Sequence, residues 1–196
     1  MQPHFSKGSS HAYAFVFSCP GKQEEDAMHP AAGKTGRNLE ALLQLLSARL
    51  GRTTLTRGCI TITNAWPQVE HQERSGRSEA TGIEIRNRSN IDRLANELRH
   101  ITEMIVFCGG KAEVALHELV KLKLIIHPTK IAVVEHIGAR GLLSIRRDIQ
   151  GKLIVAAEEQ RRLGRKLALK RIQAENTHRR LEVVAQRLLD SVKGLS

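Results

Sequence analysis

The sequence predicts an α/β fold, a three-layer α/β/α sandwich with a central, mainly parallel four-stranded sheet and a basic helical C-terminal extension. Two observations lead to this prediction. Short apolar runs rich in branched side chains alternate along the chain with longer segments that repeat apolar residues at helical spacing. Strands separated by helices pair in parallel, because the helix returns the chain to the same end of the sheet. At 196 residues with 41% apolar content, the chain can also bury one such core.

Four apolar runs are expected to form the sheet, because branched and aromatic side chains dominate them. They are YAFVF (13–17), CITITNAWP (59–67), MIVFCGG (104–110) and KIAVVEH (130–136). Apolar residues recur every three or four positions in three further segments, so helices are expected there, at about 38–50, 91–100 and 111–122. The connecting segments 19–37 and 68–90 are rich in Gly and in polar or charged residues, so both are predicted to be loops.

The character of the chain changes after Ile145. From there to the end it carries 13 Lys or Arg against 6 Asp or Glu, a net +7 of the total +11, and it is strongly helical from about Val155. An apolar stripe at helical spacing is expected to pack on the body, formed by Leu163, Leu167, Leu181, Val184 and Leu188. We therefore divide the chain into an α/β domain (1–145) and a basic extension (146–196), whose charged face is either simply solvated or a clamp for the backbone of a polyanion such as DNA.

The net charge of +11 indicates a polyanionic partner, because each Lys or Arg that meets a phosphate releases condensed counterions. Nucleic acid is the first expectation, with an anionic membrane surface or an acidic protein as alternatives. No run of apolar residues approaches the ~18 that a membrane span needs, and the N-terminus lacks the apolar core of a signal peptide. A soluble, cytoplasmic protein is expected.

Cofactor motifs are missing. The three cysteines form no C-x-x-C pair, which disfavours a zinc ribbon, an iron–sulfur cluster or a disulfide framework; they are Cys19, Cys59 and Cys108. The Gly-Lys-Thr at 33–35 is not a phosphate loop, because Met28 stands where that motif needs its first Gly. No metal or cofactor is expected.

Ligands of parallel sheets bind where the carboxyl ends of the strands meet their loops. Asn64, Gly109, Gly110 and His136 all fall at such ends, together with the 19–37 loop. Their shared location makes this edge of the sheet the expected site.

The 19–37 loop has the pattern P-G-x-x-E-x-x-x-x-x-P-x-x-G-x-x-G-x-x-L, formed by Pro20, Gly21, Glu24, Pro30, Gly33, Gly36 and Leu39. This pattern resembles the first motif of the uracil-DNA glycosylase superfamily, whose loop after the first strand wraps a flipped base. Three later segments also resemble motifs of that family, in the same order: ITITNAWP, IVFCGGKAEVAL and VVEHIGARGL. The resemblance covers about residues 13–145 and implies a monofunctional glycosylase without the iron–sulfur cysteines.

The resemblance implies a role for each site residue. His136 stabilises the charge that develops on the departing base, and Asn64 reads the edge of a pyrimidine. Glu24 or Asp26 activates the water. The base pocket includes Ser18, Cys19, Gly21 and Ala31. Arg140 is the expected wedge in the duplex, with Leu142 as the apolar alternative. The remaining DNA contacts are Lys34, Arg37, Gly109, Gly110 and Lys111. Without the resemblance, the ordinary interpretations are a structural His, an Asn that caps a turn and solvated acids.

The chain departs from the family in the same loop. Ser18 and Cys19 stand where members carry the residue that activates water. Ala31 replaces an aromatic that stacks on uracil, a contact worth ~1–3 kcal/mol, and Gly21 replaces the bulky gate against thymine. Two missing walls predict a base larger than uracil.

The expected function is therefore excision of a modified pyrimidine from DNA, most naturally double-stranded. The favoured substrate is a bulky 5-substituted cytosine, such as the hydroxymethylated or glucosylated cytosine of phage DNA, which implies an antiviral role. If Phe17 or Trp66 supplies the stack instead, the substrate is uracil. Two further alternatives are a non-catalytic DNA-binding module and a hydrolase of free nucleosides, which the net charge of +11 disfavours.

Overall fold

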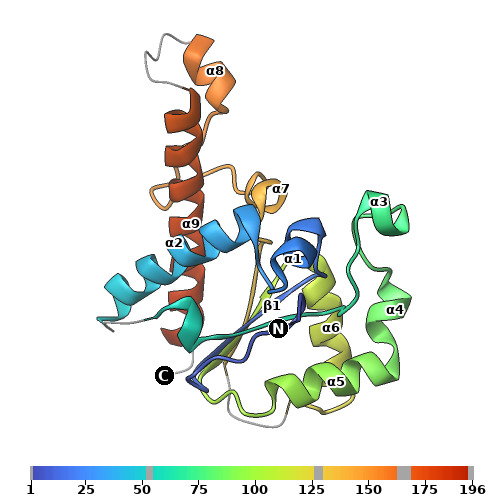
Figure 1. Cartoon of the computed structure of the whole chain (residues 1–196). Coiled ribbons are helices and arrows are strands. Elements are labelled where there is room, and N and C mark those ends of the chain that lie inside the picture. The colour runs from blue at the N-terminus through green and yellow to red at the C-terminus, as the bar shows by residue number, and fades with distance from the viewer. Residues whose placement is uncertain (1, 52–54, 126–129, 163–168, 194–196) are drawn as a thin grey trace.

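The protein folds around a sheet of four parallel strands (Figure 1). This computed structural model describes residues 2–51, 55–125, 130–162 and 169–193. The strands are β1 (Tyr13–Phe17), β2 (Thr61–Asn64), β3 (Met104–Cys108) and β4 (Lys130–Val134). They lie in the order β2-β1-β3-β4, and every neighbouring pair is parallel. The predicted α/β class and the four strands are confirmed.

Helices cover both faces of the sheet, which completes the predicted sandwich (Figure 1). One layer contains α2 (Gly33–Leu50) and α9 (Leu169–Lys193). The other contains α4 (Gly82–Arg86), α5 (Arg88–Leu98) and α6 (Gly110–Lys121). Because side chains alternate along a strand, Phe15 and Phe17 of β1 pack in the core on the α2 and α9 side, and its Ala14 and Val16 pack in the core on the other side.

The basic C-terminal segment contributes to this core. Leu181, Val184 and Leu188 are at most 2% exposed and belong to the cluster that packs α9 against α2 and β4. This confirms the predicted packing for these three residues, whereas Leu163 and Leu167 lie outside the described residues. The helix that follows the expected domain boundary at residue 145 therefore shares a hydrophobic core with the sheet.

Short helices occupy both segments that were expected to be loops. In the first, α1 (Lys22–Ala27) begins with Glu24 bonded back to Gly21, and α2 starts at Gly33, five residues earlier than expected. In the second, α3 (Gln72–Ser75) and α4 precede α5. Thr81 and Glu84 form a capping box at the start of α4. That T-x-x-E signal is visible in the sequence, and it shows that the loop prediction for 68–90 was wrong.

The remaining helices lie around the sheet. They are η1 (Arg57–Cys59) before β2, α7 (Ala139–Leu142) after β4, and α8 (Ala157–Arg162) near the start of α9. Strand β4 ends at Val134, so His136 lies in the turn between β4 and α7. Across the described ranges, no helix is both long and apolar enough to pass through a membrane.

Candidate active site at the carboxyl ends of the strands

The four strands deliver the predicted site residues to one edge of the sheet. Ser18 follows β1, Asn64 ends β2, Gly109 follows β3 and His136 lies two residues beyond β4. Because neighbouring strands are ~4.8 Å apart, three spacings separate β2 from β4 by roughly 14 Å. Asn64 ends one outer strand and His136 follows the other, so both residues lie at the same edge of the sheet.

His136 is held in one orientation by the backbone around it. Its Nδ1 accepts the backbone N–H of Gly138 at 3.0 Å, and its ring meets Phe17 edge-on at 5.7 Å between centroids. An Nδ1 that accepts an N–H carries no proton, so the proton of the neutral ring is on Nε2. Burial lowers the pKa of His136, and the charges of Glu79 and Glu24 oppose that shift. The side chain is therefore a neutral imidazole with an Nε2–H donor at neutral pH.

Three glycines allow the chain to close around His136. A Cβ at Gly109 would lie 2.9 Å from the Cβ of His136, and one at Gly141 would lie 2.0 Å from its carbonyl oxygen. At Gly138 an added Cβ would lie 2.8 Å from Nδ1. Gly109 also has a φ of +91°, which disfavours any other residue. The glycine turn after β3 and the glycines after β4 are thus required by the close packing at His136.

Asn64 has an unusual polar environment. The residue is only 2% exposed, and its side-chain oxygen Oδ1 is buried without a hydrogen-bond partner among the described residues. Its backbone carbonyl accepts an N–H of Arg93 at 2.9 Å, so the backbone at this position is satisfied. An unpaired buried acceptor costs about 1–3 kcal/mol. Such an oxygen is suited to accept a hydrogen bond from a ligand.

Glu24 connects the two ends of the first loop. Its Oε2 accepts the N–H of Gly21 and its Oε1 accepts the N–H of Ala32, both at 2.9 Å. The loop is therefore closed by one carboxylate, whose charge also acts on His136. Asp26, the other predicted base, is exposed on α1. The structure brings Glu24 to the site and leaves Asp26 at the surface.

Two small residues, Ala31 and Gly21, were expected to leave the base pocket open, and the structure differs from this expectation at Ala31. Ala31 is 3% exposed and packs in the core cluster with Phe17, so its small side chain does not open a wall. This corrects the prediction for Ala31, whose φ of +51° turns the side chain inward. At Gly21, an added Cβ would have only the Glu24 Oε2 within 4 Å, at 3.3 Å. Apart from that carboxylate, no atom packs against the position of a Gly21 side chain.

The segment between β2 and α5 closes over the same edge. The N–H of Glu70 donates to the carbonyl of Pro20 at 2.9 Å, and Trp66 Nε1 donates to Glu70 Oε1 at 3.2 Å. Arg77 pairs with both Glu70 and Glu84. Glu79, on the same segment, acts electrostatically on His136 and Cys19. Sequence analysis did not identify Glu79, because an exposed acid in a polar segment has no motif to mark it.

Replacement of Glu70 by Gln is expected to loosen this segment and to change its acid sensitivity. Hydrogen bonds from Arg77 lower the pKa of Glu70 from 4.5 to about 2. Because the pKa of Glu70 is lower in the folded state, the carboxylate stabilises the fold at any pH above its unfolded-state pKa of 4.5. This contribution is lost as the pH falls from about 4.5 through about 2. Urea unfolding at pH 7, 5 and 3 should show lower stability for Glu70→Gln at pH 7 and a flatter decline toward pH 3. The matched control Glu73→Gln, which removes an exposed pair with Lys22, should leave the curve unchanged.

The predicted DNA contacts are mostly accessible. Arg140 is exposed on α7, and Lys34 and Gly110 are exposed in the first turns of α2 and α6. Arg37 is exposed as well, whereas Gly109 and Lys111 are half-buried, as are Ser18 and Cys19 of the predicted base pocket. Leu142 is 3% exposed within the core, so it is not available as a wedge; the next residue, Leu143, is 61% exposed. The apolar wedge alternative at Leu142 is therefore wrong, and Leu143 is the exposed leucine beside it.

A metal-dependent reaction has no evident centre within the described ranges, where no three His, Cys, Asp or Glu side chains could hold a metal ion together. Neither a scan against protein-family models nor a search of curated proteins finds a match to this chain. The functional argument consequently depends on the geometry of the site.

Proposed function

We propose that this chain is a DNA glycosylase that flips out a modified pyrimidine and hydrolyses its N-glycosidic bond, leaving an abasic site. One observation supports this most directly: a neutral His136 donor and the unpaired buried oxygen of Asn64 occupy the same edge of the sheet. A donor and an acceptor at one edge of the sheet match the two needs of base excision, which are recognition of the base and stabilisation of its departing charge.

His136 acts on the leaving group. Cleavage of the C1′–N bond through an oxocarbenium-like state leaves negative charge on the departing base, shared between its ring nitrogen and the adjacent carbonyl oxygen. The Nε2–H of His136 donates to that oxygen as charge develops, and Gly138 holds the ring by its Nδ1. A donor fixed before the reaction needs no reorganisation at the transition state, which is the usual origin of such stabilisation.

Asn64 selects the base. Its unpaired Oδ1 accepts an N–H from the Watson–Crick edge of a flipped pyrimidine, and this bond satisfies an oxygen that is otherwise buried alone. Binding of the base therefore supplies the hydrogen bond that the buried Asn64 Oδ1 lacks. A base without a matching N–H leaves this oxygen unpaired and is disfavoured.

Glu24 provides negative charge near the sugar. Its carboxylate is fixed by the N–H groups of Gly21 and Ala32, and in this proposal its negative charge stabilises the cationic sugar. Water activation falls to Glu24 or to the exposed Asp26. The space beside Gly21 accepts a substituent on the base, which favours a bulky 5-substituted cytosine and a role against phage DNA.

A second candidate function is a non-catalytic DNA-binding module. Two observations favour it. Both carboxylate oxygens of Glu24 already accept backbone N–H bonds. Positions 18 and 19 carry Ser and Cys, so neither supplies an acid that could activate water. Such a module would bind DNA through the basic surface without hydrolysing a glycosidic bond.

Excision is tested with matched duplexes carrying uracil, a thymine mismatch, 5-hydroxymethylcytosine or glucosylated hydroxymethylcytosine, followed by alkali to reveal abasic sites. Cleavage confined to the bulky bases is the expected result. Cleavage of uracil alone would keep the glycosylase and reject the pocket argument, with Trp66 as the stacking aromatic. Binding that weakens with salt but without cleavage would favour the binding module.

A further inference from the structure

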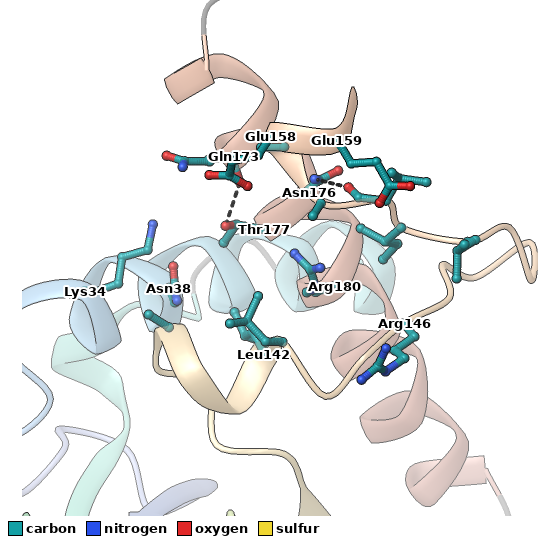
Figure 2. A pocket seen from close by; sticks show the side chains of 17 residues that line it. Lys34, Asn38, Leu142, Arg146, Glu158, Glu159, Gln173, Asn176, Thr177 and Arg180 are labelled. Atoms are coloured by element: carbon teal, nitrogen blue, oxygen red, sulfur yellow. Dashed lines mark hydrogen bonds between the residues drawn. The ribbon is translucent and has the colours of Figure 1, made fainter. Parts of the chain in front are cut away.

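A large cavity lies beside the candidate active site. It has a volume of about 630 Å³ and is enclosed by the start of α2, by α7 and the segment after it, and by α8 and α9 (Figure 2). Ala139 and Leu142 line it, and they follow His136 by three and six residues. Its volume falls in the ordinary range of ligand sites. The proposed glycosylase reaction does not use it.

Arg180 is a buried cation that faces this cavity from α9 (Figure 2). The residue is 8% exposed, and its Nε donates to the carbonyl of Ile145 at 3.1 Å. Across the described part of the chain, no acid forms an ion pair with it, and its charged neighbour is another cation, Arg179. A buried charge without a partner is costly unless an anion completes the site. The guanidinium also presents Nη donors in a fork that suits a phosphate.

Two further cations line the cavity. Lys34, in the first turn of α2, and Arg146, after α7, both line it and are exposed (Figure 2). The acids that line it, Glu158 and Glu159, both belong to α8. An anion is therefore expected at the end near α2 and α7, away from the acids of α8.

We propose that this cavity is a phosphate site centred on Arg180, and that in the DNA complex it holds a backbone phosphate of the strand whose nucleotide enters the active site. The second part rests on the proposed function, whereas binding of free phosphate does not. The position of Ala139 and Leu142 in the cavity wall connects the two sites through the turn that carries His136. A phosphate fixed there would hold the backbone next to the extruded nucleotide.

The phosphate site is tested first with inorganic phosphate and no DNA. Phosphate should raise the melting temperature of the wild-type protein above that in chloride of equal ionic strength, because a ligand of the folded state stabilises it. Arg180→Met keeps the length of the side chain, and such replacements of buried charges by apolar residues are often tolerated. The phosphate-dependent rise should disappear in Arg180→Met and persist in Arg171→Met, an exposed position on the same helix outside the cavity. An equal rise in all three proteins would overturn the proposal.

If Arg180→Met does not fold, Lys34→Met serves in its place, because Lys34 lines the cavity and is exposed. It should lower the phosphate-dependent rise without abolishing it. If Arg180→Met cannot be made and the phosphate-dependent rise in melting temperature is the same in Lys34→Met as in the wild type, the proposal is likewise overturned.

The DNA part is tested by the affinity for a duplex with a non-cleavable abasic analogue, measured at several salt concentrations. Arg180→Met should bind about tenfold more weakly and lower the slope of log K against log salt by about 0.9, the value for one phosphate. Loss of the phosphate effect with unchanged DNA affinity would keep the anion site and reject its role on DNA. A wild-type protein that binds no duplex would refute the proposed function, while the phosphate result would stand independently.

Discussion

Replacement of His136 by Ala is expected to slow base excision about 100- to 1000-fold, the usual effect of removing one fixed donor to a developing oxyanion. The reason is the hydrogen bond from Gly138 to Nδ1, which leaves the Nε2 proton aimed away from the backbone. Single-turnover excision on the preferred duplex measures the loss directly. DNA affinity should change little, since the donor acts on charge that exists only in the transition state.

His136→Gln is the matched control, because an amide keeps a neutral donor of similar length. It should recover part of the rate that His136→Ala loses. A rate in His136→Ala equal to that of the wild type would exclude His136 from the chemistry, whatever base is excised.

The same residue should give a pH signature. Burial lowers the pKa of His136 below its usual 6.5, so the unfolded chain binds the proton more readily than the folded one. Its contribution to stability is therefore complete above pH 6.5 and is lost as pH falls through the lower folded-state pKa. Protonation of Nδ1 also breaks the bond from Gly138, so excision should decline over the same range and stay constant above it.

Replacement of Asn64 by Leu is expected to reduce excision about 10- to 100-fold, the equivalent of one buried hydrogen bond of about 1–3 kcal/mol. The free energy of unfolding should stay the same or rise, because the variant removes an oxygen that is buried without a partner. Activity that falls while stability does not is typical of a residue kept for function. Urea unfolding and single-turnover excision on the same preparation test both parts.

Asn90→Leu is the control for this comparison. Asn90 is also buried, but its Nδ2 donates to the carbonyls of Ala65 and Ile85, both at 2.8 Å. Its loss removes these two bonds and the two that its Oδ1 accepts from Arg93, so the variant should be less stable by about 1–3 kcal/mol. If Asn64→Leu destabilises the protein as much as Asn90→Leu does, Asn64 has a structural role and the base-reading assignment is wrong.

Much of the site could be predicted because it depends on local patterns. The run at 13–17 is wholly apolar, and its bounds match β1 residue for residue. Asn64 and His136 follow such runs, and parallel strands place their ends at one edge. The apolar stripe on α9 was likewise visible as helical spacing, and its described members are buried.

Other features depended on contacts between distant segments. Leu142 and Leu143 are adjacent leucines, yet one is 3% and the other 61% exposed, because α9 packs against one side of α7. Ala31 turns into the core through a left-handed backbone that no composition rule marks.

The sequence by itself determined the strands, their alternation with helices and the basic charge, since these depend on side-chain type and local spacing. Only the tertiary structure decided that, among the described residues, Asn64 Oδ1 is buried without a hydrogen-bond partner and Arg180 is buried without an ion-pair partner. In sequence, Arg180 resembles the other basic residues of α9, and Asn64 resembles Asn90. Arg180 differs from the former by its burial, whereas Asn64 differs from Asn90, which is also buried, because Asn90 is hydrogen-bonded. Both differences depend on which distant elements pack around a residue.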